Sequence, residues 1–121
     1  MLLLVILSEA HRAKGFKPFA KPAAGDPDGS CTDVEGYLWN AEWGGSRITR
    51  YAPDGSLERT LALPMSRPSC CTFGGPGYRT LFVTSASNMS PEELAADPQA
   101  GALLSVELDD IAGLPAALFT L

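Results

Sequence analysis

Short apolar stretches recur between turn signals from Ser30 onward, at the spacing of about 8 to 12 residues that is typical of antiparallel meanders. Apolar and polar residues alternate along the stretch before Gly44-Gly45, which indicates a half-buried strand followed by a tight hairpin turn. Pro53-Asp54-Gly55 marks a second turn. Four consecutive strands joined by short loops have the dimensions of one propeller blade. The strands that this pattern predicts are 30–34, 37–43, 47–51 and 57–63.

The pattern restarts after Pro64 and predicts a second group of strands. A serine N-cap, a proline at the first helical position and acids in the first turn predict a short helix over 90–96, inserted in a loop. The weak repeat of strands and Gly-Gly turns favours a propeller, although an OB-like barrel or a sandwich has similar turns between its strands. The predicted strands of this second group are 69–73, 80–84 and 101–108.

The chain opens with an apolar run over 1–7, which is far shorter than the roughly 20 residues needed to cross a bilayer. It lacks the basic start and the small-residue cleavage site of a secretion signal. We therefore expect either a buried strand or a start inside a longer reading frame, and no membrane partner.

Composition narrows the class of protein. The 121 residues are 45% hydrophobic and 19% charged, as in one ordinary globular domain, and the net charge is −5 with its basic residues scattered. No basic cluster could hold a phosphate backbone, so nucleic acid is not an expected partner. Cys31, Cys70 and Cys71 form an odd set without C-x-x-C spacing, which predicts reduced thiols in the cytoplasm rather than zinc ligands or a disulfide framework.

Most catalytic arrangements are missing from the sequence. His11 is the only histidine and no G-x-S-x-G motif is present, so a serine-hydrolase triad is not expected. Gly74-Gly75-Pro76-Gly77 lacks the Lys-Ser/Thr of a phosphate loop. Trp39 and Trp43 share one face of their strand, either as packing residues or at the border of a channel. Pro-Asp-Gly occurs at 27–29 and again at 53–55, and as an ordinary turn tripeptide neither copy alone indicates a site.

One stretch carries a more specific signal. Residues 26–41 read D-P-D-G-S-C-T-D-V-E-G-Y-L-W-N-A, in which P-D-G precedes D-x-E-G-x-L-W. This motif resembles that of the SMP-30/gluconolactonase (regucalcin-like) family, and within the family the bacterial sugar lactonases look most similar. Further segments follow in the order and approximate spacing of that family, namely 43–51, 63–64, 71–76, 81–86 and 113–115.

The resemblance implies a six-bladed β-propeller that binds one divalent cation in its central channel and hydrolyses sugar lactones to aldonic acids. A full-length member is more than twice as long, so the chain matches about two C-terminal blades. We therefore expect an all-β fold of four-stranded antiparallel sheets with one short helix in a loop. Residues 1–25 match the family poorly, and 26–121 correspond to its C-terminal blades.

The resemblance also implies a role for Asp28. The family's P-D-G aspartate points into the channel, ligates the metal and acts as the catalytic acid/base. A hard cation such as calcium or zinc, with manganese or magnesium as alternatives, prefers oxygen ligands and polarises a lactone carbonyl. A carboxylate beside it can take the proton of the attacking water. The expected partner is a small-molecule sugar lactone. No functional role is predicted for Asp54, which we expect in a hairpin turn.

The other ligands of the family, a glutamate near the chain start and an asparagine from a middle blade, have no counterpart here. Four other residues carry suitable oxygen atoms, but we do not assign these roles to them. Glu35 is predicted in a turn and Asn88 in a loop. Glu42 is predicted on the face of its strand opposite Trp43, and Asn40 offers only a single amide on a strand. The isolated chain should hold an incomplete site with little activity, and its exposed blade faces would allow self-association. The alternative is a truncated, non-catalytic propeller piece, or a metal-binding protein without turnover.

Overall fold

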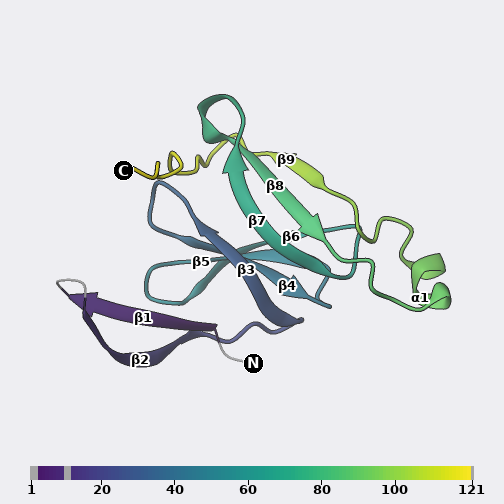
Figure 1. Cartoon of the computed structure of the whole chain (residues 1–121), viewed down its shortest axis with the longest axis horizontal. Coiled ribbons are helices and arrows are strands. Elements are labelled where there is room, and N and C mark those ends of the chain that lie inside the picture. The colour runs from purple at the N-terminus through teal and green to yellow at the C-terminus, as the bar shows by residue number, and fades with distance from the viewer. Residues whose placement is uncertain (1–2, 10–11, 121) are drawn as a thin grey trace.

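The computed structural model describes residues 3–9 and 12–120. Within them the strands form three antiparallel sheets (Figure 1). The first is a hairpin of β1 (Leu3–Glu9) and β2 (Arg12–Ala20). The second runs in the order β3 (Asp26–Thr32), β4 (Leu38–Trp43), β5 (Arg47–Tyr51) and β6 (Leu57–Ala62). The third holds β7 (Pro68–Gly74), β8 (Thr80–Ser85) and β9 (Leu104–Glu107).

The four-stranded meander confirms the predicted first group of strands, with one difference at its start. The sequence predicts a strand from residue 30, whereas β3 begins at Asp26 because Asp26 and Pro27 pair with the end of β4. The pairing register shifts between Pro27 and Ser30, so the first Pro-Asp-Gly lies in an irregular strand rather than in a turn. Such irregularities re-aim side chains at the end of a strand.

The second group of predicted strands and its helix are also present, with two differences from the prediction. The described residues of this group form a three-stranded sheet rather than a four-stranded one, and β9 covers 104–107 instead of 101–108, because the backbone N of Ala102 still donates within the preceding turn. A short 3-10 turn, η1 (Pro76–Tyr78), follows β7, and α1 (Pro91–Ala96) projects from the connection between β8 and β9 (Figure 1). The Ser90 hydroxyl accepts from the backbone N of Glu93 at 3.2 Å, and the Glu93 carboxylate accepts from the Ser90 backbone N at 2.7 Å. These two bonds form a capping box around the serine N-cap that the sequence predicts. No helix in the described ranges is long and apolar enough to cross a membrane.

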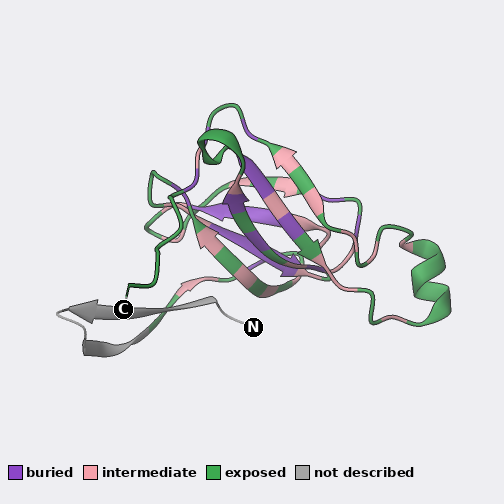
Figure 2. Ribbon diagram, turned by 45° about the horizontal axis from the view of Figure 1, so that its top comes forward, coloured by how far each residue is buried: buried purple, intermediate pink, exposed green. Residues whose placement is uncertain are grey.

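The core lies between the two larger sheets (Figure 2). Trp39 of β4 is fully buried and meets Phe73 of β7 edge to face, with ring centroids 5.6 Å apart. β3 and β7 come close at Gly29, where a Cβ would lie 2.4 Å from the Sγ of Cys70. Glycine is therefore required at position 29 by contact between strands.

A buried ion pair joins the far end of β3 to the rest of its sheet. Asp33 is fully buried, and one of its carboxylate oxygens accepts from the backbone N of Glu35 at 2.9 Å and of Tyr37 at 3.1 Å. The other oxygen accepts from Trp39 Nε1 and Arg50 Nε, both at 2.8 Å. The Arg50 guanidinium also lies 3.8 Å from the centroid of the Tyr37 ring. Because these donors replace water around Asp33, its charge is tolerated inside the protein.

Arg50→Met should lower the free energy of unfolding by roughly 3–5 kcal/mol, since it leaves the charge of Asp33 buried without its partner. Urea unfolding followed by circular dichroism measures the change. Arg59→Met is the matched control, because Arg59 pairs with Glu58 and Asp110 at the surface and should cost about 1 kcal/mol or less. Equal losses for the two variants would contradict a structural role for the buried pair.

Candidate functional site

Asp28 lies where β3 departs from regular pairing with β4. Its backbone carbonyl accepts a hydrogen bond of 2.8 Å from the Asn40 side-chain nitrogen, which also donates to the Ser30 hydroxyl at 2.8 Å. Asn40 is fully buried, so the irregular backbone is held from inside the sheet. Asp28 itself is exposed. The backbone is thus fixed while the residue faces solvent.

A cavity of about 390 Å³ lies against Asp28. It is lined by Asp26, Pro27 and Asp28 from β3 and by Trp43 from the end of β4. Trp43 is only partly buried, and the Arg67 guanidinium carbon lies 5.7 Å from its ring centroid. A volume of this order accommodates a small molecule, and a carboxylate beside an aromatic ring offers it both a polar and an apolar contact.

The two tryptophans that share a face of β4 therefore have different surroundings. Trp39 is fully buried in the core, as a blade-packing residue should be. Trp43 lies four residues further along β4, on the same face of the strand, and it borders the cavity that Asp28 lines. The packing role predicted for this pair is therefore observed for Trp39, whereas Trp43 lines a cavity.

Glu42 differs from the sequence-based expectation. It lies on the face opposite Trp43, but it does not point outward into solvent, because the segment that leads into β3 covers that face and buries it completely. One carboxylate oxygen accepts from the backbone N atoms of residues 24 and 25, each at 3.2 Å, and from Arg47 Nε at 3.0 Å. The other accepts from the Thr49 hydroxyl. With both oxygens engaged, Glu42 is a structural anchor rather than a metal ligand.

The electrostatics of Glu42 follow from these contacts. Burial by itself would raise the pKa of Glu42, but the hydrogen bonds from Arg47 and Thr49 and the charge of Arg47 outweigh it and hold that pKa below its ordinary value. The ionised carboxylate therefore holds residues 24–25, which lead directly into Asp26 and the cavity.

The remaining residues to which we assigned no ligand role are engaged elsewhere. Glu35 lies in the turn after β3 and pairs with Arg50. Asn88 lies in an exposed loop, where its backbone carbonyl accepts from Arg67 at 2.9 Å. Asn40 supports the backbone of Asp28, and its side-chain oxygen is buried without a hydrogen-bond partner. His11 lies outside the described residues.

The second Pro-Asp-Gly confirms the turn predicted for it. The Asp54 carboxylate accepts from the backbone N of Ser56 at 2.9 Å and from its hydroxyl at 2.6 Å, and Gly55 has a φ of 86°. These contacts lower the pKa of Asp54 and close the turn between β5 and β6. The same tripeptide thus forms a closed turn at 53–55 and an irregular strand at 27–29.

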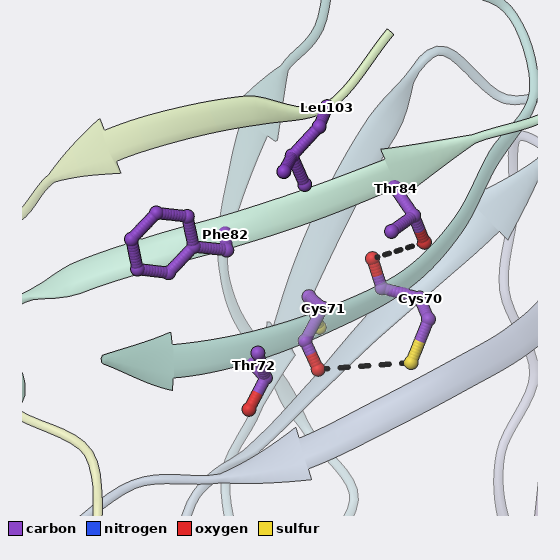
Figure 3. Close-up of a pocket in the computed structure, with 6 residues that line it drawn as sticks. All are labelled: Cys70, Cys71, Thr72, Phe82, Thr84 and Leu103. Carbon is purple, nitrogen blue, oxygen red and sulfur yellow. Dashed lines mark hydrogen bonds between the residues drawn. The ribbon is translucent and has the colours of Figure 1, made fainter. Parts of the chain in front are cut away.

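A second cavity, of about 270 Å³, lies over β7 and β8 (Figure 3). Its lining residues include neither a carboxylate, the preferred ligand of a hard cation, nor a histidine. The cavity beside Asp28 is the better candidate site. The lining residues of the second cavity are Cys70, Cys71, Thr72, Phe82, Thr84 and Leu103.

The donor chemistry at Asp28 fits part of a metal site. A carboxylate is a preferred ligand of hard divalent cations, which bind several oxygen atoms at once. Within the part of the chain that the structure describes, no three or more His, Cys, Asp or Glu side chains converge as a metal site would require. Asp28 can therefore supply one ligand, and the described residues do not supply a complete set.

Comparison with known proteins identifies the family. Its sequence profile, described as an SMP-30/gluconolactonase/LRE-like region, matches residues 6–87, more than half of the chain. The chain belongs to this family. Among curated members of the SMP-30/gluconolactonase family, it is 44% identical over 106 residues to the L-arabinolactonase of Azospirillum brasilense and 41% identical over 91 residues to chicken regucalcin. These alignments cover 85% and 74% of this chain but only 34% and 30% of those proteins.

Solved structures of the family agree with the fold. The chain superposes on a calcium-binding regucalcin from Agrobacterium tumefaciens with a TM-score of 0.81 at 31% identity, covering 90% of this chain and 38% of that one. A luciferin-regenerating enzyme gives a TM-score of 0.73 at 27% identity, covering 84% of this chain and 36% of that one. The sheets β3–β6 and β7–β9 are thus propeller-type blades, and the chain spans about a third of the length of these relatives.

Glu42→Gln should lower the free energy of unfolding at pH 7 by roughly 1–3 kcal/mol, because a neutral amide cannot satisfy the donors that meet the carboxylate. Folding lowers the pKa of Glu42, so its contribution is present above the unfolded pKa of about 4.3 and is lost as pH falls through the lower folded pKa. The difference between wild type and variant should therefore shrink toward pH 3.

Urea unfolding at pH 7, 5 and 3 tests this dependence. Glu92→Gln, at an exposed position in the first turn of α1, is the control and should change stability by only a few tenths of a kcal/mol at pH 7. A loss in Glu42→Gln that is equally large at pH 3 would show that the effect is not carried by the ionised carboxylate.

Proposed function

We propose that residues 26–121 provide the Asp28-bearing blades of a metal-dependent sugar-lactone hydrolase. The observation that carries this proposal is the contrast between the two Pro-Asp-Gly segments. Asp54 closes a turn, whereas Asp28 is exposed at a cavity and rests on a backbone that buried Asn40 holds in place. Relatives with the names L-arabinolactonase and 6-deoxy-6-sulfogluconolactonase support hydrolysis of a sugar lactone.

Two residues at the cavity, Asp28 and Trp43, have roles in this proposal. Asp28 would hold the cation through a carboxylate oxygen, and it accepts the proton of the water that attacks the lactone carbonyl carbon. The bond between that carbon and the ring oxygen then breaks, and Asp28 returns the proton to the ring oxygen to give the aldonic acid. Trp43 offers a flat apolar surface against which the sugar ring lies. A bound calcium or zinc ion would supply polarisation of the carbonyl and a more acidic water.

The described residues supply only part of the ligands that a divalent cation needs. Since the described residues bring no three ligands together, we expect the purified chain to bind a divalent cation weakly. Its turnover of gluconolactone should not exceed spontaneous hydrolysis. The free thiols of its three cysteines fit a reducing compartment such as the cytoplasm.

Titration with calcium, zinc and manganese, followed by calorimetry, tests the role of Asp28. Asp28→Asn should lower the affinity at least about tenfold, because it removes the charged ligand while keeping the shape of the side chain. Asp54→Asn, which changes the same residue in the other Pro-Asp-Gly, should leave metal affinity unchanged. Equal affinity in the wild type and the Asp28 variant would contradict the proposed ligand.

Acid release from gluconolactone, measured with each metal on the same three proteins, tests the catalytic part. We expect acid release at the spontaneous rate from all three proteins, because the described residues supply an incomplete ligand set. Metal-dependent turnover by the wild type that Asp28→Asn abolishes and Asp54→Asn preserves would contradict the incomplete site while supporting the role of Asp28. Metal-dependent turnover that persists in Asp28→Asn would contradict a catalytic role for Asp28.

A further inference from the structure

We propose that Cys31 and Cys71 are a thiol-oxidation site, at which a peroxide converts the two thiols to a reversible disulfide that joins the two blades. The sequence gives no disulfide framework, and all three cysteines are free thiols in the structure. The pair is formed by the fold, because Cys31 lies on β3 and Cys71 on β7, the adjoining strands of different sheets. The proposal does not depend on the proposed function.

The geometry brings the two sulfur atoms close together. The Sγ atoms of Cys31 and Cys71 lie 3.7 Å apart, and a disulfide requires about 2.05 Å, so they must approach by roughly 1.7 Å. The strands already meet nearby, since a Cβ at Gly29 would lie 2.8 Å from the Cα of Cys70. The two strands are thus already in contact beside this pair, and the bond requires the two sulfur atoms to close the remaining gap.

The two thiols differ in a way that suits sequential oxidation. Cys31 is partly exposed, whereas Cys71 is only 3% exposed, and the Cys71 Sγ also lies 3.5 Å from the backbone carbonyl oxygen of Trp39. The hydrogen bond with Cys71 lowers the pKa of Cys31, against the opposing effects of burial and of Asp33. The same contact and burial raise the pKa of Cys71. Within this pair, Cys31 is therefore the thiol that reacts first with an oxidant.

The reaction balances with hydrogen peroxide as the oxidant. The Cys31 thiolate attacks one peroxide oxygen, the O–O bond breaks and the other oxygen leaves, after protonation, as water. This gives a sulfenic acid on Cys31. The Cys71 sulfur then attacks the Cys31 sulfur, the S–O bond breaks, and the departing oxygen carries away the Cys71 proton as a second water. Two thiols are oxidised by two electrons, one peroxide is reduced, and a thiol reductant reverses the change.

Cys70 is the natural comparison within the same strand. It is exposed, lines the cavity over β7 and β8, and its Sγ lies 3.8 Å from the backbone carbonyl oxygen of Cys71 (Figure 3). Adjacent cysteines bridge each other only through a strained ring, so Cys70 is not a suitable partner for Cys71. Its exposure makes it the more accessible thiol, and its pairing would be favoured if access alone decided the product.

The test is peptide mapping by mass spectrometry of the purified chain after treatment with one equivalent of hydrogen peroxide, without reduction. We expect a peptide pair linked through Cys31 and Cys71, a chain mass lower by two hydrogen atoms, and full recovery of the thiols with dithiothreitol. Cys70→Ser should give the same product. Cys31→Ser should give none, and the oxidised wild type should unfold at a higher temperature than the reduced form.

Three results would overturn the proposal. One is a disulfide that includes Cys70, within a chain or between chains, as the main product. Another is oxidation of single thiols to sulfinic acid with no linked peptide. The third is a linked Cys31–Cys71 product that forms equally well in chemically unfolded chain, because the fold would then not be what brings the pair together. The wild-type map decides among them even if a variant fails to fold.

Discussion

The carboxylate of Asp33 is the interaction on which the rest of this structure depends. Its four hydrogen bonds join the turn after β3 to Trp39 in the core and to Arg50 on β5. A backbone bridge from Asp33 to Gly113 also attaches the C-terminal segment. Removing water from a charge is costly, so the sequence must supply every one of these donors together. Once it does, the register of β3 against β4 is fixed.

That register determines how Asp28 is presented. Buried polar groups hold β3 at three places: Asp33 at its far end, Asn40 beneath the irregular segment, and Glu42 through the residues that precede Asp26. The carboxylate of Asp28 is left at the cavity, while its backbone has little freedom. A group that must meet a cation or a water in a fixed position benefits from this rigidity, because no ordering of the backbone is needed at binding.

Much of the fold could be predicted from local sequence, because turns and caps depend on residues close together in the chain. The Gly44-Gly45 hairpin, the Asp54 turn and the Ser90 helix cap are examples. The site was less predictable. The face of β4 that carries Glu42 is covered by a segment almost twenty residues earlier in the chain. Alternation along β4 therefore predicted the face on which Glu42 lies, but it could not predict that this face is buried. The support from Asn40 follows only once the pairing of β3 with β4 is known.

Crystals of the chain grown with manganese would test the central claim, that β3 presents Asp28 as a metal ligand. The anomalous signal of the ion locates it without reference to the protein atoms. This account predicts a peak on the carboxylate of Asp28 beside Trp43, and none on the closed turn at Asp54. A peak on Asp54 alone, or an Asp28 carboxylate engaged in an ion pair with this chain's own side chains, would contradict it.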